Sequence, residues 1–379
     1  MRGYDVAVVG AGIAGAAVAW ACASRGARVI VLERQLPASG ASGAAAGMLA
    51  PCSEADGVGP FLDLGRESLA LWPAFAGRLL GETGIDCELD TCGLLRLALD
   101  EEDVSVLRER MSWQRAVGVD VEWLDADAVA ADEPALAPVS GAALYAGEGH
   151  VNSARTVFAL LCAAQRHGAA VQNGADVVGW LQGGGVRLSD GRSVSAGAVV
   201  LCAGAWTPMV GAALGAPTVS IEPVRGELLR LRGVTPAPGR VLFGGRRGYA
   251  VTKADGVTLV GATEVRAGFD ARSTSAGEAW LTGVADQLLL GADGARVDGV
   301  RVGLRPRSPD GLPTMGRLDD RRGGGALFVA TGHYRNGVLL APVTADGMSS
   351  IILEGVVPPA WIAFDAHRHQ VGPARAEAG

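Results

Sequence analysis

The sequence from Tyr4 to Arg34, YDVAVVGAGIAGAAVAWACASRGARVIVLER, decides the fold of this chain. Residues 5–9 are short and β-branched, residues 13–24 are small and helix-forming, and residues 28–32 are apolar again. A Gly-x-Gly-x-x-Gly run joins the first strand pattern to the helix pattern. This order predicts a strand, a tight turn, a helix and a second strand.

The three glycines of the turn have separate roles in binding a dinucleotide. Gly10 permits the turn, Gly12 lets a pyrophosphate approach the backbone, and Gly15 lets the helix touch the strand. The start of the helix also offers unpaired N–H groups to the anion. Glu33 stands where a carboxylate would bond ribose hydroxyls, and its charge disfavours a 2′-phosphate. We therefore predict a dinucleotide site that does not accept NADP.

A signal peptide or a membrane span is the alternative interpretation of the same stretch. Val6 to Ser24 carries no charge, Arg2 precedes it, and Ala21-Cys22-Ala23 resembles a cleavage site. Three glycines would weaken a spanning helix, however, and cleavage would remove the whole glycine motif. The dinucleotide interpretation is therefore preferred.

The composition sets limits on size and on partners. The chain has 379 residues, of which 49% are hydrophobic, so it can bury a large core and is expected to form two domains. The net charge is −7 and no basic block occurs, which makes nucleic acid and acidic membranes poor partners.

The cysteine spacing predicts no metal site. None of the six cysteines forms Cys-x-x-Cys or has a histidine at metal-ligand spacing, so most are expected to be buried thiols in a reducing cytosol. No cysteine follows residue 202 and no histidine precedes residue 150, which restricts covalent attachment of a cofactor. A dissociable cofactor is expected.

The rest of the chain alternates helix and strand patterns. Helices are predicted at residues 61–80, 101–117, 125–133, 154–167, 275–290 and 337–353. Strands are predicted at residues 170–172, 176–181, 198–202 and 326–331, and antiparallel hairpins across residues 219–265 with a tight turn at Asp255-Gly256. The small apolar residues from Ala38 to Pro51 predict a loop that can lie flat against a large planar ligand.

Five motifs follow one another across nearly the whole chain. They are GAGIAG at residues 10–15, ASGAAAGMLAP at 41–51, PVRGE at 223–227, GLRPRSPDGLPTMG at 303–316 and ATGHYRNGVLLAPVTA at 330–345. With these motifs the chain resembles the flavin-dependent amino acid oxidases, and most closely the glycine oxidases of thiamine biosynthesis. The first motif alone would indicate only a dinucleotide fold, whereas the last two together are characteristic of the group.

The resemblance implies an α/β (α+β) fold with a Rossmann-like domain that binds FAD non-covalently. The FAD-binding domain would comprise residues 1–85, 146–217 and 298–379, and the substrate-binding domain residues 86–145 and 218–297, built on an antiparallel sheet that walls the cleft. Met48 would lie over the flavin ring. The residues implied to bind FAD are Gly10, Gly12, Ile13, Ala14, Gly15, Glu33, Arg34, Ala41, Ser42, Ala46, Gly47, Met48, Val177, Gly204, His333, Tyr334, Arg335, Asn336, Gly337, Val338 and Leu339.

Three residues are expected to hold the substrate carboxylate. Arg305 would be the main clamp, because a guanidinium is always charged and can bind a carboxylate with two parallel hydrogen bonds. Tyr249 would add a hydroxyl donor, with Arg335 nearby. A helix that begins directly after GHYRN would favour the negative charge of a reduced flavin. His333 has no acid partner in the sequence and is expected to be structural rather than a base.

By resemblance, the reaction is the oxidation of glycine or another small amino acid. A hydride would leave Cα for flavin N5, giving an imine, and O2 would reoxidise the flavin to give H2O2. The imine would hydrolyse or pass to a thiazole synthase. The same resemblance suggests a cytoplasmic homotetramer.

Several points about the substrate and the electron acceptor stay open in the sequence. Glu264 either faces outward as a solvated residue, which is preferred, or faces the substrate amine, which would favour a basic or secondary amine. A cluster of Arg246, Arg247 and Arg307 would suit a phosphonate or a second carboxylate. A quinone-linked D-amino acid dehydrogenase and a flavin-carrying protein without turnover are the alternative functions, although no basic membrane anchor is evident.

Overall fold

The first strand of the chain, β1 (Tyr4–Val9), lies within a largely parallel sheet. The computed structural model describes residues 3–320 and 324–369, and its first sheet has the order β17-β18-β11-β1-β2-β8. β1 pairs in parallel with β2 (Val29–Glu33) and β11 (Ser193–Leu201). The other strands are β8 (Ala170–Asn173), β9 (Val177–Trp180), β10 (Gly185–Leu188), β17 (Thr314–Asp320) and β18 (Ala326–Thr331). The predicted α/β fold class is confirmed.

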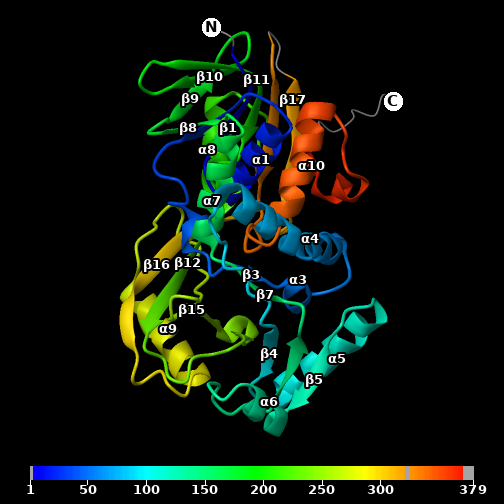
Figure 1. Cartoon of the computed structure of the whole chain (residues 1–379), viewed down its shortest axis with the longest axis vertical. Helices are drawn as coiled ribbons and strands as arrows, with labels where there is room; N and C mark the ends of the chain where they lie inside the picture. Colours follow the sequence, from blue (N-terminus) through cyan, green and yellow to red (C-terminus); the bar gives the residue numbers. More distant parts are fainter. Residues whose placement is uncertain (1–2, 321–323, 370–379) are drawn as a thin grey trace, which may run out of the picture.

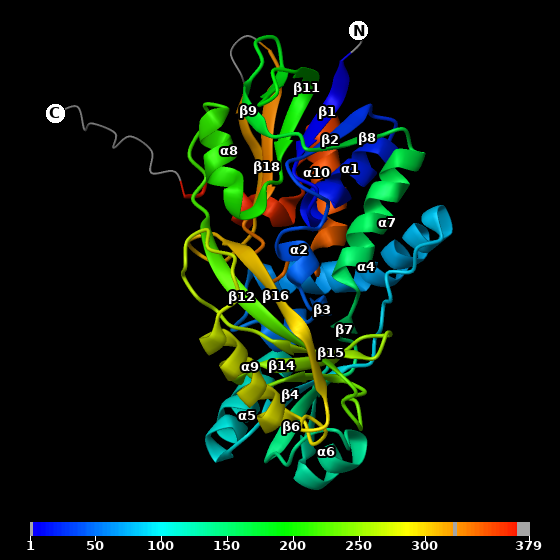
Figure 2. The ribbon, with the colours of Figure 1, turned by 90° about the vertical axis from the view of Figure 1, so that its left-hand side faces the viewer.

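Alternate residues of β1 enter two separate cores. Val6 and Val8 pack against α1 (Ile13–Ser24) and its neighbours, whereas Ala7 and Val9 belong to the core on the other face. Such alternation is the period of a strand buried on both faces. The helices that pack with α1 are α4 (Pro60–Thr83), α7 (Ser153–Arg166) and α10 (Ala341–Glu354), and α8 (Thr207–Ala213) covers the opposite face (Figure 2).

The second sheet contains the predicted hairpins. Its order is β16-β12-β15-β14-β13-β4-β6-β5, with antiparallel neighbours except where β13 runs parallel to β4. The strands are β4 (Leu94–Ala98), β5 (Glu122–Asp125), β6 (Gly141–Tyr145), β12 (Glu222–Arg232), β13 (Val241–Phe243), β14 (Tyr249–Thr252), β15 (Val257–Gly261) and β16 (Arg296–Arg307). The helices beside this sheet are α5 (Glu101–Ala116), α6 (Ala126–Asp132) and α9 (Ser275–Leu288). The antiparallel sheet and the turn at Asp255-Gly256 are confirmed.

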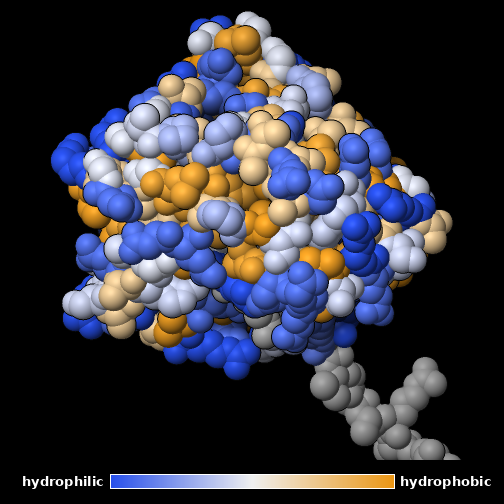
Figure 3. All heavy atoms as spheres, turned by 90° about the horizontal axis from the view of Figure 1, so that it is seen from below, coloured by the Kyte–Doolittle hydropathy of each residue, from blue (hydrophilic) through white to orange (hydrophobic). Residues whose placement is uncertain are grey.

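The two sheets form the two halves of the molecule (Figure 1). The first sheet and its helices lie in the upper half with both chain ends, and the second sheet lies below. The division into two domains at the predicted boundaries stays a prediction. Seen from below, hydrophilic residues surround a smaller central group of hydrophobic ones (Figure 3). None of the helices in the described ranges is both long and apolar enough to cross a membrane.

Two predicted elements differ from the structure. The segment from Ala38 to Pro51 is not a plain loop, because it contains α2 (Ala41–Ala44) and β3 (Met48–Leu49), which pairs with β7 (Gly149–His150). α3 (Pro51–Glu54) follows it. The last long helix begins at Ala341 and not at Gly337, since a turn intervenes and Pro342 occupies the first helical turn, where its missing N–H costs no hydrogen bond. The described ranges also contain the short 3₁₀ helices η1 (Gly204–Trp206), η2 (Gly245–Arg247) and η3 (Pro359–Phe364).

Candidate active site

A cavity of about 1300 Å³ lies between the two sheets. The glycine turn after β1, the α2 to β3 segment and the 333–338 turn line one end of it. Side chains from β4, β13, β14 and β16 line the other end. We call these the cofactor end and the substrate end.

At the cofactor end, the glycine turn leaves no space for side chains. A Cβ on Gly10 would lie 2.5 Å from the Cys202 carbonyl oxygen, and Gly10 has a φ of +107°. A Cβ on Gly15 would lie 2.0 Å from the Gly10 carbonyl oxygen. Only glycine therefore lets α1 approach β1 this closely, as the motif predicted.

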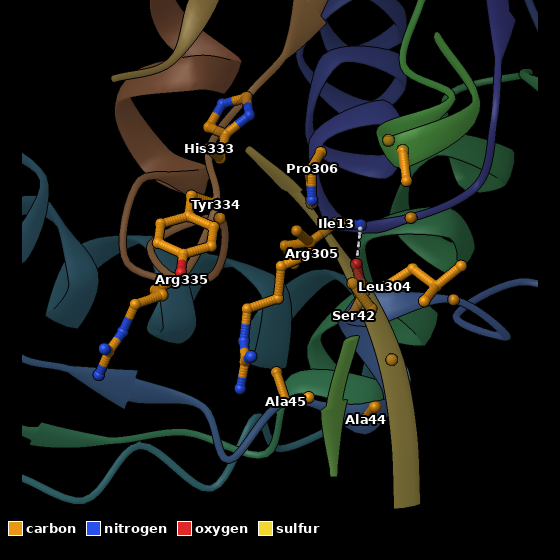
Figure 4. A pocket seen from close by; sticks show the side chains of 18 of the residues that line it. Ile13, Ser42, Ala44, Ala45, Leu304, Arg305, Pro306, His333, Tyr334 and Arg335 are labelled. Atoms are coloured by element: carbon orange, nitrogen blue, oxygen red, sulfur yellow. Dashed lines mark hydrogen bonds between the residues drawn. The ribbon is translucent and has the colours of Figure 1, made fainter. Parts of the chain in front are cut away.

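Hydrogen bonds fix the residues around this turn. The Ala11 N–H donates to Glu33 Oε2 at 2.8 Å and the Gln35 N–H to Glu33 Oε1 at 2.8 Å, which orients the carboxylate at the end of β2. The Ile13 N–H donates to Ser42 Oγ at 2.9 Å (Figure 4). Glycine and alanine residues of the turn and of the α2 to β3 segment also line this end, so a dinucleotide can lie directly against the main chain there.

These features fit FAD. Most residues expected to bind it do line the cavity, namely Gly10, Gly12, Ile13, Ala14, Glu33, Arg34, Ala41, Ser42, Ala46, Gly47, Met48, Val177, Gly204, His333, Tyr334, Arg335, Gly337 and Val338. Gly15, Asn336 and Leu339 are not among the residues that line the cavity. The Leu339 carbonyl, for example, accepts from Ser68 Oγ at 2.6 Å and Trp72 Nε1 at 2.9 Å. Their contribution is to the shape of the wall.

At the substrate end, Arg305 reaches across a neighbouring strand. It lies on β16 opposite Val224 of β12, and its guanidinium extends diagonally over Gly226, where a Cβ would lie 2.3 Å away. Nη1 donates to the Thr263 carbonyl at 3.0 Å, leaving further N–H groups for a ligand. Burial lowers the pKa of Arg305, but a guanidinium stays charged at neutral pH.

Tyr249 approaches Arg305 from the other side. It lies on β14 opposite Gly261 of β15, and a Cβ on Gly261 would lie 2.4 Å from the Tyr249 hydroxyl oxygen. Since the sheet order is β16-β12-β15-β14, Arg305 and Tyr249 converge over two strands that carry glycine at the crossing points. Burial raises the pKa of Tyr249, so the hydroxyl stays a donor.

Arg335 extends in the same direction as Arg305 (Figure 4). Its Nε lies 3.4 Å from Glu54 Oε2, and this carboxylate raises the pKa of Arg335. Tyr334 has a left-handed φ of 51°, which is uncommon outside glycine and turns the chain between Arg335 and His333. The three residues expected to hold a carboxylate thus line one end of one cavity.

His333 lies away from the substrate end. It is buried, and its Nε2 is 3.1 Å from Thr344 Oγ1 on α10. Burial lowers its pKa to about 4, which keeps the imidazole neutral. This environment suits the structural role that we predicted.

Glu264 lies at the rim of the cavity with an exposed side chain. Burial and then the Glu264 carboxylate raise the pKa of the nearby Tyr334 to about 12. Glu264 therefore lines the opening while it stays in contact with solvent.

The extra arginines that we expected to cluster lie in different places. Arg307 lines the cavity and lies 3.8 Å from Glu222, whereas Arg247 does not line it and pairs with Asp100 at 2.7 Å. The side chain of Arg246 lies outside the described part of the chain. Arg307 reaches the cavity from the end of β16, whereas Arg247 lies in the 3₁₀ helix η2 and does not.

Sequence reasoning missed Glu54 and Arg96, which both line the substrate end. Glu54 ends the segment after the ASGAAAGMLAP motif, and Arg96 is the one polar residue of the LLRLA strand β4. The sequence shows this polar residue, but it does not show which face of the strand points into the cavity.

A separate group of residues lies outside the cavity. Potential ligand atoms of Asp90, Cys92 and His150 all lie within 4.8 Å of one another, although the sequence spacing gave no sign of it. Lys253 Nζ is 3.1 Å from His150 Nδ1, and burial lowers the pKa of His150 to about 3. The expectation that no metal is bound stays a prediction. All six cysteines are free thiols, four of them buried.

Comparison with known proteins agrees with this geometry. The model of the FAD dependent oxidoreductase (DAO) family matches residues 5–351. The chain is 38% identical to a glycine oxidase of Geobacillus kaustophilus (strain HTA426), over 90% of each chain. A crystal structure of glycine oxidase from that organism covers 97% of this chain and 99% of its own, with 36% identity and a TM-score of 0.91. A bifunctional protein ThiO/ThiG of Synechocystis sp. is 33% identical over 96% of this chain and 54% of its own length.

Proposed function

The chain belongs to the family of FAD-dependent oxidoreductases, and on that premise we propose that it oxidises glycine or another small amino acid with O2 as the acceptor. The observation that carries this proposal is the convergence of Arg305 and Tyr249 at the substrate end of a cavity whose other end fits FAD. Similarity to proteins named glycine oxidase supports the choice of substrate class.

The chain would hold FAD through the glycine turn, Glu33 and the 333–338 turn. N–H groups at the start of α1 suit the pyrophosphate, and the fixed Glu33 carboxylate suits the ribose hydroxyls. When bound, FAD supplies a two-electron acceptor for a hydride, and its reoxidation by O2 yields hydrogen peroxide.

The protein groups at the substrate end act by binding and orientation. Arg305 offers two parallel N–H donors to the α-carboxylate, and the Tyr249 hydroxyl donates to the same group. Arg335, held by Glu54, adds positive charge near the rim. Because these groups fix the substrate in one orientation, the site needs no protein base for the chemistry. The neutral His333 is engaged with Thr344 and takes no part.

The exposed position of Glu264 supports a small neutral amino acid over a basic one. A carboxylate in contact with solvent holds an amine less strongly than a buried one, because water screens the charge. Glycine would give glyoxylate, ammonia and hydrogen peroxide.

An anaerobic titration tests this proposal. Purified protein should show flavin absorbance, and glycine, sarcosine or D-alanine should bleach it within the time of turnover. Admission of air should restore the absorbance with one peroxide formed per flavin reoxidised. Bleaching without peroxide, reversed only by a quinone, would favour the D-amino acid dehydrogenase instead. No bleaching by any of the three would leave a flavin-carrying protein without turnover.

We further propose that the imine product serves a thiazole-forming partner in thiamine biosynthesis. Support comes from the relatives named bifunctional protein ThiO/ThiG, in which the matching part is joined to further chain. Thiazole formation by the purified partner should depend on this protein and glycine, and glyoxylate with ammonia should not replace them at equal concentration. The homotetramer expected from the resemblance is tested by light scattering.

A further inference from the structure

One arginine at the substrate end has no role in the proposed reaction. Arg96 on β4 pairs in register with Phe243 on β13, and Phe243 pairs with Tyr249 on β14. Residues paired across strands share one face of a sheet, so Arg96, Phe243 and Tyr249 form a row that faces the cavity. With neighbouring strands about 4.8 Å apart, the Cα of Arg96 lies roughly 10 Å from that of Tyr249.

Arg96 has no carboxylate of its own. Its Nη1 donates to the Ser53 carbonyl, and its guanidinium lies 5.2 Å from the Phe243 ring centroid. Within residues 3–320 and 324–369, no ion pair joins Arg96 to an acidic side chain.

The acidic groups nearby are already engaged. Glu54 lies 3.4 Å from Arg335 Nε. Asp56 lies 3.6 Å from Arg110 Nη1, and its side chain is 99% exposed. Glu148 is buried and accepts from the Cys52 and Ser53 N–H groups.

A second cation, Arg110, lies beside Arg96 and adds to the positive charge there. Arg110 donates to the same Ser53 carbonyl as Arg96, so two guanidinium groups share one neutral acceptor. Burial, and then the charge of Arg110, lower the pKa of Arg96 to about 10, which still leaves it charged at neutral pH. A half-buried cation without a counter-ion is unfavourable, and an anionic group of a ligand would remove that cost.

We propose that Arg96 binds a second anionic group of the substrate, a carboxylate or a phosphonate, while Arg305 and Tyr249 bind the α-carboxylate. The row of side chains places the two anion-binding groups at opposite sides of Phe243, whose ring can contact the short carbon linker between the two acids. The preferred substrate class is then an amino acid with an acidic substituent on nitrogen or on Cα. This inference rests on the proposed function and refines it.

Matched substrate pairs test the inference. Iminodiacetate and N-(phosphonomethyl)glycine compare with sarcosine, and D-aspartate compares with D-alanine. In at least one pair, the parent protein should give a higher kcat/KM for the acidic substrate than for the neutral one. Whether that acidic substrate carries a carboxylate or a phosphonate tells which group Arg96 prefers. Arg96→Met should lower that acidic-to-neutral ratio about 10- to 100-fold, as expected for loss of one charged partner.

Two other variants separate charge recognition from a structural role. Arg96→Lys keeps the charge and should retain more of the ratio than Arg96→Met. Arg247→Met removes an arginine that pairs with Asp100 outside the cavity and should leave the ratio unchanged. A ratio that is equal in the parent and Arg96→Met would overturn the inference.

Ligand binding gives a readout that does not depend on turnover. Calorimetric titration of the FAD-loaded parent should show malonate or succinate binding at least about tenfold tighter than acetate, which corresponds to about 1.4 kcal/mol. Equal affinities would overturn the inference even if Arg96→Met failed to fold. If malonate, succinate and acetate bind equally but neutral amino acids are still oxidised, the inference fails and the proposed function stands. If the dicarboxylates bind tightly but no amino acid bleaches the flavin, only the proposed function is rejected.

Discussion

The two ends of the cavity are built in different ways. At the cofactor end, glycine and alanine bring the main chain to the surface, and residues 4–34 supply the strand, the turn and the acidic residue in one local unit. At the substrate end, charged and aromatic side chains come from β4, β14, β16 and the 333–338 turn, which are far apart in sequence. The first end depends on local backbone geometry and the second on strand register.

The substrate end also depends on glycine, but for another reason. Gly226 and Gly261 have no ligand to hold; they leave room for Arg305 and Tyr249 to cross β12 and β15. At the cofactor end, glycine lets the main chain approach a ligand. At the substrate end, glycine makes room for the protein's own side chains to reach the ligand site. Four changes test this contrast.

The largest effect is expected from Gly15→Val at the cofactor end. The new Cβ would lie 2.0 Å from the Gly10 carbonyl oxygen, so α1 must move away from β1. We expect loss of nearly all bound FAD and a lower free energy of unfolding, by at least about 3 kcal/mol. The ratio of flavin to protein absorbance measures the bound FAD, and thermal unfolding measures the change in stability. Gly77→Val, on an open face of α4, is the control and should keep its FAD.

Arg305→Met should affect the substrate end alone. Removal of the charged partner of a carboxylate is expected to lower kcat/KM for glycine about 10³-fold, while FAD stays bound. Steady-state peroxide formation measures kcat/KM, and flavin absorbance measures the bound FAD. Arg296→Met removes an exposed arginine from the same strand and should retain the parent activity. Retention of more than a tenth of the activity by Arg305→Met would rule out its role as the main clamp.

Gly226→Ala tests the space for the clamp without changing the clamp itself. Its methyl group would lie 2.3 Å from the Arg305 guanidinium, and the flexible arginine must shift. We expect a fall in kcat/KM of about 10- to 100-fold, or about 1.4–2.8 kcal/mol, with little change in unfolding temperature. Gly283→Ala on α9, where a methyl group meets open space, serves as the control. Unchanged kinetics would show that Arg305 binds substrate from another position.

The last change, Glu148→Gln, acts on the pH dependence of stability. Burial raises the pKa of Glu148 from 4.5 to about 7, so its folded pKa is above its unfolded one. Its contribution to stability is therefore full below about pH 4.5 and is lost as the pH rises to about 7, by at most about 1.4 kcal/mol per pH unit. The glutamine variant should lack this decline.

Thermal unfolding between pH 4.5 and 8 measures the difference between the parent and this variant. Glu109→Gln, which removes an exposed carboxylate from α5, controls for net charge and should follow the parent curve. Parallel curves for the parent and Glu148→Gln would contradict the prediction. Since Glu148 accepts from the Cys52 and Ser53 N–H groups, a confirmed effect would place this titration beside Glu54 at the substrate end.

The strand-turn-helix unit, the fold class and most residues that line the cofactor end could be predicted from the sequence. Glycines at fixed spacing report directly on a backbone that must turn and pack closely, and this information is local. The strand at Ala326–Thr331 and the helix near Glu101 were predicted closely for the same reason, since period and capping residues lie within one element.

Which charged residues contact one another depends on the tertiary structure and could not be predicted from the sequence. Arg96 and Arg247 look alike in the sequence, yet the register of β4 against β13 turns Arg96 into the cavity, whereas Arg247 lies in η2 and pairs with Asp100. The same holds for Glu54, whose Oε2 lies 3.4 Å from Nε of Arg335, a residue far away in the sequence. Partners that come from different strands depend on long-range pairing, and no local pattern carries that information.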